Sequence, residues 1–168
     1  MARVLSMAVA ILGCLATGTG AGVRMSPEAL RGAPQTIQVD GVVLQLKAQV
    51  WRDFMPGLLS GADTKPGESA VPGRRMIAAL RVAARDGQRV PKGIRVDAGW
   101  IIFGDRVWAS QPAEEQPRDP AAYDLSVTMR NGPKWPPQAV VDIVVRIVDS
   151  KGVAQLLALR NQKIEAAT

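Results

Sequence analysis

The charged side chains of this chain that could carry chemistry are carboxylates, guanidinium groups and a few amines, and the chain has no histidine and one cysteine. Catalysis by a serine, threonine or cysteine nucleophile usually needs a histidine as base, and zinc or copper sites are usually built from histidine and cysteine. A serine–lysine pair would need no histidine, but no lysine stands in a Ser-x-x-Lys motif. We therefore expect no catalytic residues, no cofactor and no metal.

Carboxylates leave one enzymatic alternative, since two acids that meet in a cleft can act as general acid and base. In this sequence the acidic residues are spread out, and they form no calcium-binding loop. Asp142 and Arg146 share the polar side of one segment. We expect either a surface ion pair or two separate solvated charges there. A carboxylate-based hydrolase is accordingly the least favoured function.

A run of basic residues between positions 74 and 95 could bind anions. Arg75, Arg81 and Arg85 have the same parity, so a strand here would carry them on one face as a positive stripe. Such a stripe would attract anionic envelope polymers or lipid head groups; alternatively, it is a solvated polar face. Nucleic acid is not an expected partner, because no aromatic residues alternate with the basic ones for base stacking.

Two tryptophans stand beside basic residues next to loops. Trp51 and Arg52 end a predicted strand, and an outward tryptophan next to an arginine suits recognition of a sugar or a peptide. Lys134 and Trp135 lie in a proline-rich loop over residues 131–137, which could present them to a partner. Alternatively, both tryptophans cover the ends of the core. We select these four residues as candidate contacts, with the positive stripe second.

The N-terminus reads as an export signal over residues 1–21. Arg3 precedes an apolar run at 4–12, which is too short to span a bilayer, and small residues follow. The stretch Ile11-Leu12-Gly13-Cys14 resembles the lipobox of bacterial lipoproteins, which implies lipidation at Cys14. Cleavage before residue 22 is the alternative. We expect an exported protein that is periplasmic, extracellular or held at a bacterial membrane through this lipid anchor alone.

The rest of the chain is dominated by short segments with alternating apolar residues, separated by glycine, proline and aspartate turns. After a flexible linker at 22–34, residues 35–168 form one domain of seven to eight strands. The predicted strands are 36–40, 42–52, 75–84, 94–103, 106–109, 123–130, 140–148 and 153–160. The alanine-rich segment 75–84 could instead be a helix. An antiparallel two-sheet sandwich would bury all the apolar faces; a closed barrel is the alternative.

Two short stretches resemble immunoglobulin-like domains. Asp119-Pro120-Ala121-Ala122-Tyr123 is similar to the tyrosine corner of those domains, and Trp100 resembles their core tryptophan. Leu125 stands where their second cysteine would be, and the first is missing as well. The apolar face that carries Trp100 is predicted to hold Ile94, Val96, Ala98, Trp100 and Ile102. The resemblance implies an immunoglobulin- or fibronectin-III-like fold, and it implies nothing about function.

Together these features predict a non-catalytic, exported β-sandwich domain that serves as a binding or structural module at the bacterial cell envelope. The expected partner is an envelope protein or an anionic envelope polymer. The alternative is a secreted protease inhibitor, which would present an exposed loop at 56–73 or 131–137.

Overall fold

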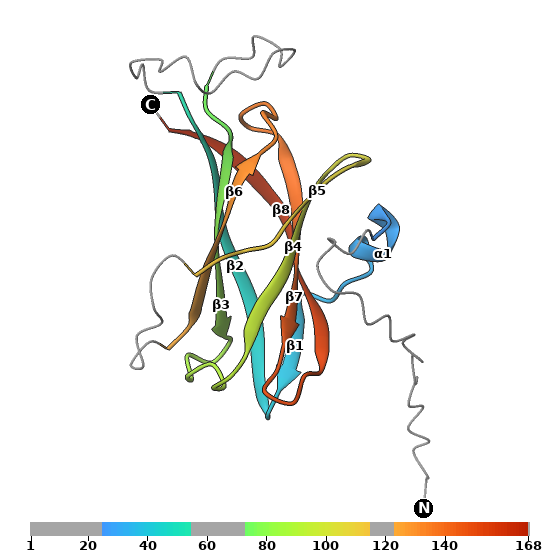
Figure 1. Cartoon of the computed structure of the whole chain (residues 1–168), viewed down its shortest axis with the longest axis vertical. Coiled ribbons are helices and arrows are strands. Elements are labelled where there is room, and N and C mark those ends of the chain that lie inside the picture. Colours follow the sequence, from blue (N-terminus) through green and yellow to red (C-terminus); the bar gives the residue numbers. More distant parts are fainter. Residues whose placement is uncertain (1–24, 55–72, 115–122, 168) are drawn as a thin grey trace, which may run out of the picture.

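The computed structural model describes residues 25–54, 73–114 and 123–167, and shows an all-β fold in that part of the chain. Every predicted strand is present, and residues 76–84 of the segment 75–84 form a strand rather than a helix (Figure 1). The elements are α1 (Pro27–Arg31), β1 (Thr36–Val39), β2 (Val42–Asp53), β3 (Met76–Ala84), β4 (Arg95–Phe103), β5 (Arg106–Ser110), β6 (Leu125–Gly132), β7 (Val140–Val148) and β8 (Ala154–Ala167).

The strands form one curled, mixed sheet in the order β5-β4-β7-β8-β2-β3-β6, with β1 paired to β2. The long strand β8 joins the half of the sheet that contains β5, β4 and β7 to the half that contains β1, β2, β3 and β6. It pairs antiparallel with β7, and its last residues pair in parallel with β2 from Ile164 onward. Asn161, with φ of 56°, lies at the register shift within the pairing of β7 with β8, just before the parallel pairing begins. Because β8 belongs to both halves, the predicted two-sheet, immunoglobulin-like sandwich is not confirmed.

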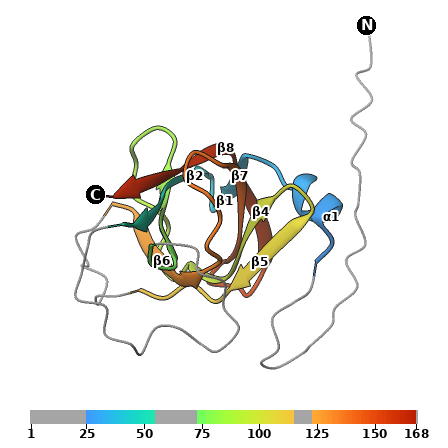
Figure 2. The same cartoon turned by 90° about the horizontal axis from the view of Figure 1, so that it is seen from above.

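The sheet curls until its two edge strands approach each other, so that the strands surround a common centre (Figure 2). After β5 the chain crosses to β6, where Ala113 and Thr128 exchange two backbone hydrogen bonds of 3.1 and 2.9 Å. This bridge connects the ends of the curled sheet.

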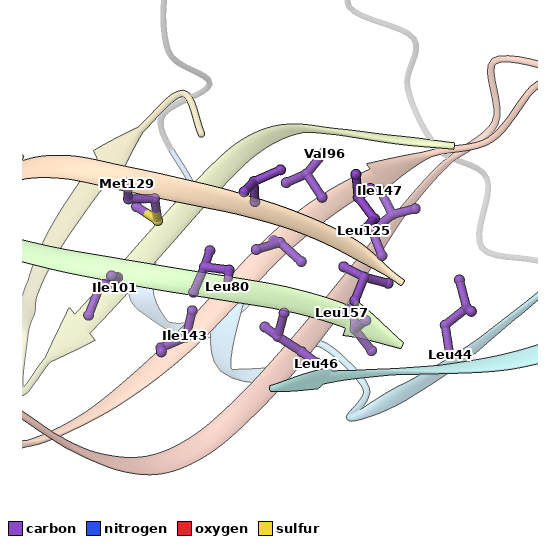
Figure 3. Packing of buried hydrophobic residues seen from close by; sticks show 14 of the residues in the cluster. Leu44, Leu46, Leu80, Val96, Ile101, Leu125, Met129, Ile143, Ile147 and Leu157 are labelled. Atoms are coloured by element: carbon purple, nitrogen blue, oxygen red, sulfur yellow. The ribbon is translucent and has the colours of Figure 1, made fainter. Parts of the chain in front are cut away.

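The main core fills the inside of this curl (Figure 3). Alternation along each strand directs one set of apolar residues inward, as Ile143, Val145 and Ile147 show in β7. Gly99 lies against this core on β4: a β-carbon there would be 2.8 Å from Sδ of Met129. The glycine therefore lets β6 pack closely against β4.

A smaller cluster lies on the outside of β4, β7 and β8, under α1. Ser26 caps the helix by accepting a hydrogen bond of 3.2 Å from the amide of Ala29, and Pro27 begins it. Leu30 is fully buried against the sheet. The segment 22–34, which we expected to be a flexible linker, thus contains a docked helix from residue 27 to 31.

The pairing of β4 with β7 shifts between Val96 and Ala98, which reverses the facing of the residues that follow. Val96 faces the main core, whereas Ala98 and Trp100 face α1. The expected single apolar face is therefore wrong, and Trp100 is not the tryptophan of the main core. Tyr123 is 63% exposed, with its ring 5.0 Å from the Arg89 guanidinium, so it is not packed as a corner residue.

Candidate functional site

The outer surface of β2, β3 and β6 gathers several of the predicted binding residues on one face. Their strands alternate, so that Leu46 and Leu80 point inward while their neighbours point outward. We call this surface the basic sheet face; its residues are Gln45, Lys47, Gln49 and Trp51 of β2, Ile77, Ala79, Arg81 and Ala83 of β3, and Ser126 and Thr128 of β6.

Lys47 lies directly opposite Arg81 in the antiparallel pair of β2 and β3. Like charges in this position repel and destabilise the sheet. The charge of Arg81 is compensated in part, because its Nε lies 3.2 Å from Oδ2 of Asp124. The Arg81 side chain is 59% exposed, so solvent weakens this ion pair. Lys47 is exposed and forms no ion pair with any residue that the structure describes. The centre of the face thus has a surplus of positive charge.

The predicted positive stripe follows β3 and passes beyond its end. Arg81 is exposed on the outer face, and Arg75 is half-buried just before the strand begins. Arg85 is exposed just after the strand, where its amide donates a hydrogen bond of 2.8 Å to the carbonyl of Val43. The strand and the parity that we predicted for Arg81 are confirmed.

Trp51 lies on the same face, in the row next to Lys47 and Gln49. It is half-buried, opposite Ile77 of β3 and beside Glu165 of β8. Nε2 of Gln49 donates a hydrogen bond of 3.2 Å to Oε2 of Glu165. The structure therefore unites Trp51 with the positive stripe, although the sequence suggested them as separate features.

Arg52, which we selected as a contact residue, points the other way and is 1% exposed. Its Nε donates to the carbonyl of Arg74 at 3.1 Å, its Nη1 donates to the carbonyl of Trp135 at 2.9 Å, and its guanidinium lies 4.7 Å from the Phe54 ring centre. Burial lowers the pKa of Arg52 below its ordinary value. These contacts make Arg52 a structural residue.

Trp135 is 6% exposed and packs on Phe103, with ring centres 5.4 Å apart. It closes one end of the main core, which is the alternative that the sequence left open, and Lys134 beside it is half-buried. The loop 131–137 is thus held at its centre. Cys14 and residues 55–72 lie outside the described residues.

The carboxylates of the outer faces have structural partners of their own. Arg146 binds Asp97 with two hydrogen bonds of 2.7 and 3.0 Å, and does not pair with Asp142. Asp142 instead accepts from the amide of Asn161 at 3.0 Å and lies 3.6 Å from Nη1 of Arg160. Over residues 25–54, 73–114 and 123–167, no group of three or more potential ligands could hold a metal ion.

Lys47, Gln49 and Glu165 were not selected from the sequence. Lys47 and Gln49 alternate with apolar residues along β2, which signals only an outward position. Their significance depends on the register with β3 and on the return of β8 beside β2, and neither is written in local sequence.

No protein-family model, curated protein or solved structure is detectably similar to this chain. In the part of the chain that the structure describes, no helix is long and apolar enough to cross a membrane. The chemistry of the basic sheet face is therefore the main guide to function.

Proposed function

We propose that this protein is a non-catalytic binding module of the bacterial cell envelope, and that its basic sheet face binds an anionic envelope polymer. The location rests on the leader at residues 1–21, which is either cleaved before residue 22 or processed to a lipid anchor at Cys14. The binding role rests on the charge and composition of the face.

The observation that carries the proposal is the pair of Lys47 and Arg81. A like-charged pair directly opposite across two strands destabilises the sheet. A polyanion that touches both side chains would remove this repulsion and gain attraction at the same place. The electrostatic free energy of this pair should thus be lower in the complex with the polyanion than in the free protein.

The neighbours of this pair leave room for an extended ligand. Ala79 and Ala83 flank Arg81 on β3, and Ser126 lies opposite it on β6. Such short side chains let a chain molecule lie close to the sheet and reach the two basic groups. The hydrogen-bonded strands beneath fix the spacing of the two backbone positions, so only the Lys47 and Arg81 side chains need to be ordered on binding.

Lipid head groups carry the same charge, but a polymer fits the arrangement better. The N-terminal helix α1 packs outside β4, β7 and β8, across the curl from β3 and β6 (Figure 2). A lipid anchor at Cys14 would tether the protein by the side that carries α1. The β3 and β6 side of the basic sheet face would then lie farther from the bilayer than α1, open to material in the envelope.

The test compares two double variants that lose the same charge. Lys47→Gln with Arg81→Gln removes the central pair, whereas Lys92→Gln with Arg106→Gln removes two exposed charges elsewhere. We expect the first variant of the exported protein to lose binding to polygalacturonate in calorimetry, while the control binds like the parent. Attraction between exposed charges weakens as the salt concentration rises. The parent should therefore bind polygalacturonate more weakly at high salt. Equal affinity of both variants for a polyanion that the parent binds would contradict the proposal.

A further inference from the structure

We infer that the polymer is an acidic polysaccharide, which places a sugar ring over Trp51 and an acidic group between Lys47 and Arg81. This inference rests on the proposed function and specifies its ligand. It comes from the different chemistry at the two ends of the row Lys47, Gln49 and Trp51 on β2.

The Trp51 end carries groups that suit a sugar rather than a bare anion. An indole ring offers a flat apolar surface to the carbon–hydrogen face of a pyranose. Next to it, the Glu165 carboxylate accepts hydrogen bonds from hydroxyl groups, and Gln49 holds this carboxylate at 3.2 Å. A negative side chain here would repel a simple anion but would bind a hydroxyl-bearing ring.

The Lys47 end carries the opposite chemistry. Lys47 and Arg81 provide two adjacent positive groups, and the only acid paired with Arg81 among the described residues is Asp124. A carboxylate or phosphate group of the ligand fits between them through charge-assisted hydrogen bonds. The two ends together call for a ligand with both hydroxyl-bearing rings and acidic groups.

The spacing requires a chain rather than a single sugar. Lys47 and Trp51 are four residues apart on the same side of β2, which is about 13 Å at roughly 3.3 Å per residue. Gln49 lies between them, opposite the short side chain of Ala79. A polysaccharide of a few units can span this distance and pass over Gln49 without a bulky obstacle.

The experiment uses two anionic probes that differ in sugar content: polygalacturonate, which has rings and carboxylates, and inorganic polyphosphate, which has no rings. Trp51→Ala removes the aromatic platform, Trp51→Phe keeps one, and Tyr123→Ala removes an aromatic ring outside the basic sheet face. Thermal melting of each variant verifies that it is folded before binding of the exported protein is measured.

We expect Trp51→Ala to weaken binding of polygalacturonate by about 2- to 10-fold and to leave binding of polyphosphate unchanged. Trp51→Phe should restore most of the lost affinity, and Tyr123→Ala should bind like the parent. If Trp51→Ala does not fold, the parent is compared with Trp51→Phe instead. Polygalacturonate should then change the tryptophan fluorescence of the parent more than that of Trp51→Phe.

Other results separate the two proposals. If Trp51→Ala affects neither probe, or both equally, the ring-stacking inference is wrong while the anionic site stands. The same holds if only polyphosphate binds. If removal of Lys47 and Arg81 changes neither probe, or if neither probe binds to the parent, the proposed function itself fails.

Discussion

Arg52 donates a hydrogen bond of 2.9 Å to the backbone carbonyl of Trp135, a residue 83 positions away in the sequence. A second hydrogen bond, of 3.1 Å, reaches the carbonyl of Arg74. One buried guanidinium thus ties β2 to the segment before β3 and to the loop before β7. It holds together the end of the fold where Trp135 covers the core.

Arg52→Met should destabilise the protein by about 3 kcal/mol, because it leaves two carbonyl groups without their donor. Urea unfolding measures the change. Arg74→Met is a matched control: that side chain is 67% exposed and pairs only loosely with Asp53 at 3.5 Å, so it should cost less than about 1 kcal/mol. Equal unfolding midpoints for the two variants would argue against a structural role for Arg52.

Arg160 should hold α1 on the sheet. Its Nη2 donates to the carbonyl of Arg31, the last residue of the helix, at 2.7 Å and to the carbonyl of Ala33, two residues beyond it, at 3.0 Å. In Arg160→Met we expect amide hydrogen exchange of residues 28–33 to accelerate about 10-fold or more, as the loss of about 1.4 kcal/mol implies, while β7 stays protected. Arg146→Met breaks a different ion pair on the same face and should leave exchange in α1 unchanged; acceleration there as well would rule out a specific clamp.

Val145 is fully buried in the main core, so Val145→Asp should bury an unpaired charge and unfold the protein. Val153→Asp introduces the same residue at a position that is 53% exposed, and it should melt like the parent. Circular dichroism during heating compares them. A folded Val145→Asp variant would mean that the inward face of β7 is misassigned.

Asp142→Ala should cost about 1–2 kcal/mol. The change removes the acceptor of the Asn161 amide and one neighbour of the Arg160 guanidinium. From the sequence alone, a solvated surface residue with little effect would be expected. Denaturant unfolding distinguishes the two values, and a loss within experimental error would favour the solvated position.

Gly99→Ala should destabilise the protein by about 1–3 kcal/mol, because the added carbon would lie 2.8 Å from Sδ of Met129 and 3.1 Å from Cγ of Pro112. Gly32→Ala is the contrasting variant: its φ is −75° and its nearest neighbour would be at 3.4 Å, so it should be neutral or stabilising. If Gly99→Ala melted at the same temperature as Gly32→Ala, the close packing of β4 and β6 would be contradicted.

The sequence determined the strands but not their arrangement. Alternation is a local property, and it located β7 at 140–148 with its observed bounds. Pairing is not local: the parallel contact of β8 with β2 and the register that sets Lys47 opposite Arg81 join residues far apart in the chain. The sequence therefore indicated Trp51 and the positive stripe as separate features, and only the pairing of the strands showed that they belong to one face.

Burial of polar and aromatic side chains was decided by tertiary structure as well. The sequence suggested Arg52 as a contact residue and left Trp135 open between a contact and a cover for the core. Both are buried at the end of the core, where Arg52 donates a hydrogen bond to the carbonyl of Trp135. For Trp100, a single register shift in β4 was enough to turn it from the main core to the face under α1. Alternation in the sequence predicts which residues of a regular strand share a side, whereas register shifts and packed neighbours decide which side a residue faces and what covers it.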